Sequence, residues 1–118
     1  PESGVDLAAS QEQVIRNVHD YMVEHLSERI TIEELSREFL MNTTTLKTVF
    51  KKVYGTSLAA HWKAHRMEKA ASLLLSAQED VGAIARAVGY ESQSRFTAAF
   101  REEYGVSPGE YRRSHKPG

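Results

Sequence analysis

The sequence predicts an all-α fold of seven helices, forming two helix-turn-helix subdomains joined by a long linker helix. The main observation is a repeat, because residues 46–57 and 96–107 follow the same pattern. Each of the two segments has apolar residues at its first and fifth positions, a Tyr-Gly pair at its ninth and tenth positions, and a serine at its twelfth position. The apolar residues recur at helical spacing and nowhere alternate at period two, so no strand is expected.

Composition excludes several classes of protein. The chain has 118 residues, one domain's worth, and no cysteine, so neither a disulfide framework nor a thiolate metal site is available. No apolar run approaches the roughly 20 residues that span a bilayer, and no signal peptide is visible. We therefore expect a soluble cytoplasmic protein without a membrane partner. The chain starts at Pro1 rather than methionine, which leaves open whether it is a fragment or a standalone protein.

The charge is unevenly distributed. The net charge of −1 by itself argues against a nucleic-acid partner. However, residues 1–38 hold three basic and nine acidic side chains, residues 39–78 hold six basic and one acidic, and residues 79–118 hold six of each. Because a phosphate backbone meets a local basic face and not the total charge, the middle of the chain remains a candidate for binding DNA.

The first subdomain is predicted to cover residues 10–56, after a tail of linker composition at 1–9. Its first helix opens at a capping box formed by Ser10 and Gln13. The apolar stripe expected on this helix is Val14, Val18, Tyr21, Met22 and Leu26.

Two shorter helices follow in this subdomain. A second capping box, Thr31 with Glu34, opens a helix whose apolar residues are Ile32, Leu35 and Phe39. The next helix begins after Asn42 and ends at Gly55, a typical left-handed stop. Its buried stripe is expected to be Leu46, Val49, Phe50 and Val53.

The linker helix is predicted over residues 57–76, with Ser57 as its cap, and the second subdomain over residues 77–118. Asp80 caps a short helix, Gly89 and Tyr90 form the turn, and Ser92 opens a helix that ends at Gly105. A last helix starts at the capping box of Ser107 and Glu110, with proline in its first position. The residues expected in the second core include Val81, Ile84, Ala85, Val88, Phe96, Ala99 and Phe100.

In a helix-turn-helix unit the second helix enters the major groove of DNA. At 100° per residue, the side chains opposite each buried stripe can be identified. In the first copy they are Thr44, Thr48 and Lys51, flanked by Thr45, Lys47 and Lys52; in the second they are Ser94, Ala98 and Arg101, flanked by Arg95, Thr97 and Glu102, with Gln93 in the first turn.

These residue types suit DNA recognition. Lys51, Lys52 and Arg101 can neutralise phosphates, while Gln93 can pair with adenine and Arg95 with guanine. Short side chains such as Thr44, Thr48 and Ala98 can meet thymine methyl groups. The helix N-termini near Thr31, Ser57 and Ser107 can each hold a phosphate through backbone N–H groups.

A less specific interpretation competes with this one. A basic stripe opposite an apolar stripe is usually only a solvated face, and Arg95 can equally contact phosphate or solvent. Two such stripes in matched repeats favour DNA binding over that interpretation. The aromatic residues Phe50, Tyr54, Trp62, Phe100 and Tyr104 are expected in the core.

The second repeat resembles the signature of the AraC/XylS family of bacterial transcription regulators. The positions that carry the resemblance are Ile84, Ala85, Gly89, Tyr90, Ser94, Phe96, Phe100, Arg101, Gly105, Pro108, Tyr111 and Arg112. The first repeat is similar to the family's weaker first unit through Leu35, Ser36, Leu46, Phe50, Lys51 and Gly55, and the linker helix through Arg66, Met67, Ala70, Leu73 and Leu74. The resemblance covers about residues 10–114.

The resemblance implies a seven-helix DNA-binding domain whose two recognition helices enter successive major grooves, about 34 Å apart. It places base contacts on Thr44, Lys47, Thr48, Gln93, Ser94 and Ala98. It also implies an N-terminal effector-sensing domain in a longer protein, although a standalone regulator of this size is known in the family.

The sequence departs from the family pattern at a few positions. Thr48 and Ala98 are short where relatives often carry long side chains, so more specificity is expected from groove shape. Ser36 replaces the usual alanine, and Gly82 in a first helical turn costs up to about 1 kcal/mol against alanine.

Two other functions compete with DNA binding. An enzyme is not expected, because no nucleophile stands beside a histidine in a recognisable motif, and no cofactor is implied. His61 and His65 have zinc-ligand spacing, but no third ligand is evident, so packing is favoured and no metal is expected. A protein-interaction module is compatible with the acidic first helix, for which RNA polymerase is a candidate partner.

Overall fold

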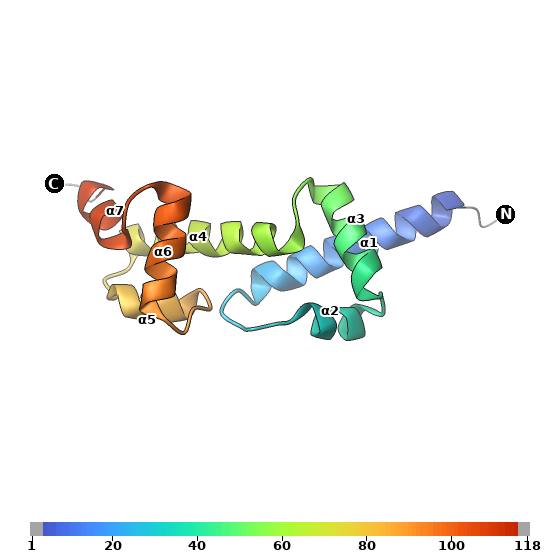
Figure 1. The fold of residues 1–118 in the computed structure, drawn as a ribbon, viewed down its shortest axis with the longest axis horizontal. Helices are drawn as coiled ribbons and strands as arrows, with labels where there is room; N and C mark the ends of the chain where they lie inside the picture. The colour runs from blue at the N-terminus through green and yellow to red at the C-terminus, as the bar shows by residue number, and fades with distance from the viewer. Residues whose placement is uncertain (1–3, 116–118) are drawn as a thin grey trace. The chain divides into compact units, whose positions relative to one another are not determined.

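The computed structural model describes residues 4–115, with side chains described from Ala9 onward. Within that range it contains seven α-helices and no strand, which confirms the predicted fold class (Figure 1). The helices are α1 (Gly4–Glu24), α2 (Ile32–Phe39), α3 (Thr43–Tyr54), α4 (Leu58–Ser76), α5 (Val81–Ala87), α6 (Gln93–Tyr104) and α7 (Pro108–His115). No helix among the described residues is long and apolar enough to cross a membrane.

The helices form two compact units. The first unit contains residues 1–25 and 30–62, and therefore α1, α2, α3 and the first residues of α4. The second contains residues 26–29 and 63–118, and therefore the rest of α4 with α5, α6 and α7. Each unit holds one pair of helices joined by a short turn, α2–α3 in the first and α5–α6 in the second.

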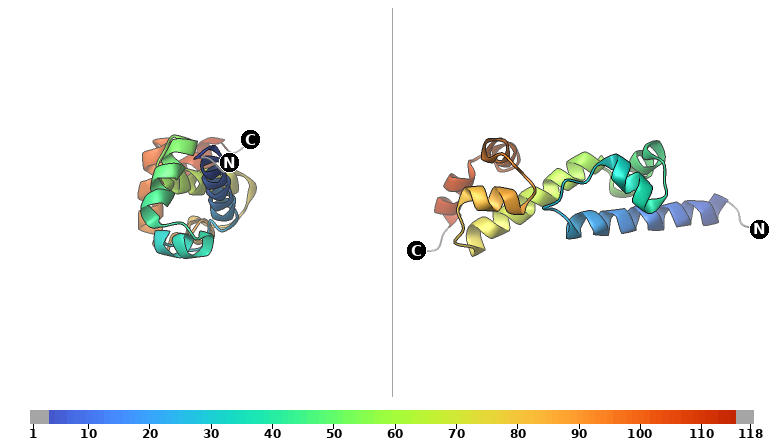
Figure 2. Two further views of the ribbon diagram at one scale, coloured as in Figure 1. Left: turned by 90° about the vertical axis from the view of Figure 1, so that its right-hand side faces the viewer. Right: turned by 90° about the horizontal axis from the view of Figure 1, so that it is seen from below.

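The start of α1 was predicted wrongly. The helix begins at Gly4, six residues before the expected cap at Ser10. Its N-terminal turns extend beyond the ends of α2 and α3 (Figure 2). The residues just before Ser10 include Ala8 and Ala9, which have the highest helix propensity. A serine can therefore lie inside a helix without capping it.

The first core differs from the prediction by one position on α1, and on α3 the expected Val49, Val53 and Tyr54 are only half-buried. Ile15 is fully buried and was not expected, whereas Val14 is only half-buried. Both residues lie at helical spacing from Val18, so the apolar pattern alone cannot choose between them. The remaining buried residues of this unit are Val18, Met22, Leu35, Leu46, Phe50, Leu58 and Trp62.

The second core follows the prediction closely. Buried residues of α4, α5 and α6 form a single cluster that includes Met67, Ala70, Leu74, Ile84, Ala85, Val88, Phe96, Ala99 and Phe100. Two expected members differ, because Val81 is only partly buried and Tyr104 is 38% exposed. The Tyr104 ring stacks on Phe100 with the centroids 4.6 Å apart and lies against the Tyr111 ring at 5.3 Å.

The predicted caps form at the helices that follow α1, and Asn42 caps α3, for which only the start of the helix was predicted. Each capping side chain accepts a hydrogen bond from the backbone N–H three residues on. The donor–acceptor distances are 3.1 Å at Thr31, 2.8 Å at Asn42, 3.1 Å at Ser57, 2.8 Å at Asp80, 3.2 Å at Ser92 and 3.2 Å at Ser107. At α7 the reciprocal bond is also present, because the Ser107 N–H donates to Glu110 Oε1 at 3.3 Å.

The turns of the two helix pairs share a left-handed residue but differ in what surrounds it. Leu40 has φ 54° and a 92% exposed side chain, while Gly89 has φ 90°. A Cβ on Gly89 would lie 2.5 Å from the Leu26 carbonyl oxygen. That oxygen accepts a hydrogen bond from Arg66 Nε at 3.1 Å, and Arg66 Nη2 donates to the Glu28 carbonyl at 2.9 Å. Glycine is therefore required in the second turn for space as well as for φ.

Candidate nucleic-acid interface

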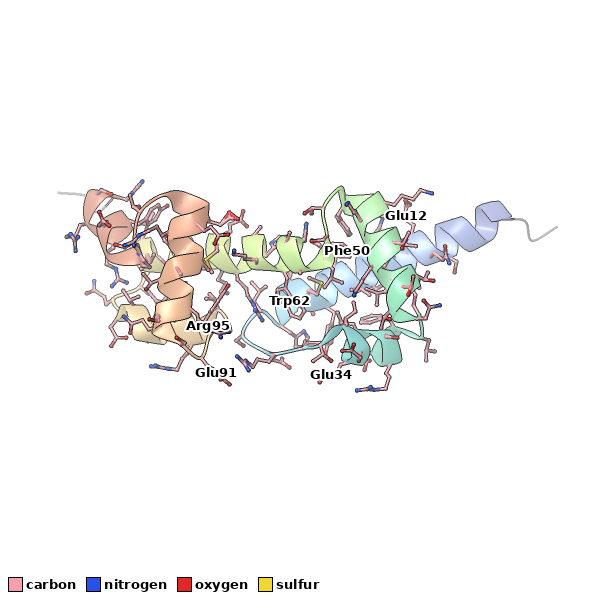
Figure 3. All side chains as sticks on the ribbon, viewed as in Figure 1. Glu12, Glu34, Phe50, Trp62, Glu91 and Arg95 are labelled. Carbon is pink, nitrogen blue, oxygen red and sulfur yellow. The ribbon has the colours of Figure 1, made fainter. Side chains whose placement is uncertain are left out.

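Helix α3 separates its apolar and polar residues onto opposite sides. Leu46 and Phe50 are fully buried against the first core, with Phe50 labelled in Figure 3. The side chains that the sequence assigned to DNA all lie on the surface, with Thr45 half-buried at the margin. The exposed set is Thr44, Lys47, Thr48, Lys51 and Lys52.

Helix α6 has the same arrangement in the second unit. Phe96, Ala99 and Phe100 are buried, and Thr97 is half-buried. The exposed set is Gln93, Ser94, Arg95, Ala98 and Arg101 (Arg95 is labelled in Figure 3). Each helix thus presents a polar surface of short and basic side chains within its own unit.

Two contacts around α6 were not apparent from the sequence. A Cβ on Gly82 would lie 3.0 Å from Gln93 Oε1, so this glycine leaves room for the Gln93 side chain. Glu102, on the flank of α6, accepts a hydrogen bond from Lys63 Nζ at 2.9 Å, which raises the pKa of Lys63. Lys63 partly offsets the negative charge that Glu102 brings to the margin of this surface.

The three helix N-termini considered for phosphate binding differ in charge. Helix α2, capped by Thr31, has Glu33 and Glu34 in its first turn. Helix α7, capped by Ser107, has Glu110, whose hydrogen bonds with Ser107 hold the pKa of the carboxyl below its usual value. Helix α4, which follows Ser57, has no acidic residue in its first turn. Since carboxylates repel phosphate and compete for the same N–H groups, the α4 N-terminus is the most favourable of the three.

Three aromatic side chains of the first unit surround His61. The ring of His61 packs on Phe50 and Tyr54, with centroids 5.4 Å and 5.1 Å away. His19 of α1 lies against His61 with the ring centroids 4.9 Å apart, which places an unexpected second imidazole beside His61. The signal was weak in the sequence because 42 residues separate the two histidines. Burial also raises the pKa of the Tyr54 hydroxyl.

Comparison with known proteins identifies the class. A family model described as a helix-turn-helix domain matches residues 35–114, which include the later part of α2 and all of α3, α4, α5 and α6. The chain belongs to this helix-turn-helix family, which is of the AraC/XylS type.

Among curated proteins, the chain is similar to the HTH-type transcriptional regulator ExsA of Pseudomonas aeruginosa, with 36% identity over 88 residues, 75% of this chain and 32% of ExsA. It is 31% identical over 107 residues to the uncharacterized HTH-type transcriptional regulator YisR of Bacillus subtilis, which covers 91% of this chain and 37% of YisR. The chain therefore spans about a third of the length of these relatives.

Among solved structures, the C-terminal domain of AraT, a response regulator from Geobacillus stearothermophilus, matches with a TM-score of 0.86 and 34% identity, covering 89% of this chain and 88% of that domain. The DNA-binding domain of AdpA, a global transcriptional factor solved in complex with a target DNA, matches with a TM-score of 0.82 and 26% identity. That match covers 86% of this chain and 91% of the AdpA domain.

Proposed function

We propose that the chain binds double-stranded DNA in a sequence-specific manner and thereby regulates transcription. The observation that carries this proposal is the exposed polar side of the second helix in each of two helix-turn-helix units. The likeness to the AdpA domain, solved with its target DNA, supports it. In this function α3 and α6 are the recognition helices, and they enter successive major grooves of one duplex.

The base-facing residues are proposed from their position and chemistry. On α6, Gln93 pairs with an adenine edge, and Arg95 reads guanine or contacts a phosphate. Ala98 and Thr48 are too short for bidentate pairing and instead contact thymine methyl groups. The full proposed base-facing set is Thr44, Lys47, Thr48, Gln93, Ser94, Arg95 and Ala98.

The phosphate contacts supply most of the affinity. Lys51, Lys52 and Arg101 extend from the last turns of their helices, which suits them to the backbone rather than to the bases. Ser57 adds a phosphate site at the N-terminus of α4, and Thr31 and Ser107 add weaker ones because of their neighbouring glutamates.

The family supports a proposal for the wider role of the protein. We propose that a longer protein joins an N-terminal effector-sensing domain to this chain, that the regulator works in the bacterial cytoplasm, and that it contacts RNA polymerase. The similar curated proteins are named as transcriptional regulators, and none of the proposed roles requires an enzymatic reaction.

In vitro selection from a random duplex library tests the proposal. We expect a recovered motif with two conserved segments whose centres lie about one helical turn apart. The affinity for the selected duplex should fall about 10³–10⁵-fold between 50 and 200 mM salt, if 6–10 phosphates are contacted. A library that yields no motif, or a binding constant that ignores salt, would favour a protein-interaction module instead.

Single substitutions refine the test. Lys51→Ala and Arg101→Ala should each reduce the slope of log affinity against log salt by about one unit. Lys69→Ala is the matched control, because Lys69 is an exposed lysine of α4 outside the proposed contact set. If the slope of log affinity against log salt is the same for Lys51→Ala as for the parent, Lys51 does not contact a phosphate.

A further inference from the structure

A groove with apolar walls lies beside the polar surface of α3, entirely within the first unit. Its walls come from Ile30 and Ile32 before and at the start of α2, and from Leu58 and Trp62 on α4. Lys47 and Lys51 of α3 line it as well. The groove has a volume of about 560 Å³, within the range of roughly 300–1,000 Å³ that is typical of small-molecule sites.

The charged side chains that line the groove are of one sign. Lys47 and Lys51 are one helical turn apart, so their ammonium groups lie on the same side of α3. Ser57 and the N-terminus of α4, which carries partial positive charge, form part of the lining. None of the described residues that line the groove is acidic. The site therefore combines an apolar floor with a cationic margin.

We infer that this groove binds a small amphipathic carboxylate, with the apolar body against Leu58 and Trp62 and the carboxylate between Lys47 and Lys51. An uncharged apolar molecule would form no ion pair with the two ammonium groups, and the two ammonium groups would repel a cation. The apolar walls in turn disfavour a purely polar anion such as free phosphate, because burying such an ion against hydrocarbon removes its hydration.

Occupation of the groove would affect DNA binding, and this consequence depends on the proposed function. Lys47 and Lys51 are proposed DNA contacts, and both would be engaged by the carboxylate. The ligand would thus compete with DNA for two cations on α3, and we expect the affinity for the selected duplex to fall at least about fivefold in its presence.

The sole tryptophan of the chain, Trp62, lines the groove and provides a direct signal. Titration with decanoate, below the concentration at which it forms micelles, should change Trp62 fluorescence in a saturable manner. Decanol should bind about three- to tenfold more weakly, because it lacks the two exposed ion pairs. Hexanoate should bind at least tenfold more weakly, because each buried methylene contributes about fourfold. An equal response to decyltrimethylammonium would overturn the inference.

Two matched variants locate the site. Ala59 lines the groove and is exposed, so Ala59→Phe should fill it and abolish the decanoate response. Ala60 is also exposed and does not line the groove, so Ala60→Phe should respond as the parent does. In the double variant Lys47→Gln/Lys51→Gln, which changes only surface side chains, decanoate and decanol should bind equally. Retained decanoate binding by a folded Ala59→Phe variant would contradict the assignment.

The outcomes separate this inference from the proposed function. If the parent binds its selected duplex and Trp62 ignores decanoate, the groove assignment fails and DNA binding stands. If Trp62 responds in the predicted order of ligands and no duplex is bound, the groove assignment stands and the proposed function fails.

Discussion

Replacing Gly89 with alanine should destabilise the second unit far more than a change of one methyl group suggests. Gly89 has φ 90°, which an L-residue adopts at a cost of about 1–2 kcal/mol. The added Cβ would also lie 2.5 Å from the Leu26 carbonyl oxygen and 2.9 Å from Arg66 Nη2. Neither is the free end of a flexible side chain, because the oxygen is backbone and Arg66 is held by two hydrogen bonds.

The magnitude follows from these contacts. To relieve the overlap, the Leu26 carbonyl and the Arg66 guanidinium must move apart from Gly89, which weakens two charge-assisted hydrogen bonds worth about 1.5–3 kcal/mol each. Burial lowers the pKa of Arg66, so this guanidinium is partly withdrawn from solvent and depends on these carbonyl oxygens as hydrogen-bond partners. Backbone strain and partial loss of these bonds together predict a destabilisation of about 3 kcal/mol.

Urea unfolding monitored by circular dichroism measures the effect, with Gly105→Ala as control. Gly105 belongs to the same unit and has φ 79°, but nothing lies within 4 Å of its ideal Cβ. The control should therefore lose only about 1 kcal/mol, from backbone strain offset by lower entropy of the unfolded chain. Equal losses in Gly89→Ala and Gly105→Ala would refute the role assigned to the close contact.

Four further predictions concern other positions. Leu40→Gly should stabilise the first unit by up to about 1 kcal/mol in the same urea assay, because it relieves a positive φ at a side chain that is 92% exposed; a loss of stability would show that this side chain makes contacts. Gln93→Ala should relax the preference at one base position by about 1–3 kcal/mol, and an unchanged motif after repeated selection would rule out direct readout. Arg112 donates to the Leu74 and Ala77 carbonyls at 2.9 and 3.1 Å, so Arg112→Met should cost about 2–4 kcal/mol while Arg113→Met, on an exposed side chain, costs little. The pKa of the Glu110 carboxyl is lower in the folded state than in the unfolded state. The ionised carboxylate therefore stabilises the fold above the unfolded-state pKa, and this stabilisation is lost as the pH falls through the folded-state pKa. Glu110→Gln should flatten the acid limb of the curve of unfolding free energy against pH, and an acid limb identical to the parent's would contradict the assignment.

The repeat and the caps were readable in the sequence because both depend on local chemistry. A capping side chain bonds to an N–H only three residues away, as at Asp80 and Ser92. The glycine stops at Gly55 and Gly105 likewise depend on the φ of one residue. Because these signals need no distant partner, the helices that follow α1 matched their predicted positions.

The mistakes lie where the sequence offers two equivalent answers. Val14 and Ile15 both fit the stripe of α1, and packing against the rest of the unit buried Ile15. Ser10 resembles a cap, but the preceding alanines let the helix continue through it. The surface positions of the proposed DNA-facing residues followed from helical periodicity, while their partners on DNA remain predictions.

The number and order of the helices, the two repeated units and the solvent-facing sides of α3 and α6 can be derived from the amino-acid sequence, because they arise from contacts within a few residues. Three other features required the packed helices: Gly89 must clear the Leu26 carbonyl, Gly82 leaves room for Gln93, and Ile30 and Trp62 share a groove with two lysines. Those features join residues 11 to 63 positions apart in the chain. Their contacts depend on how whole helices pack, which no local pattern encodes.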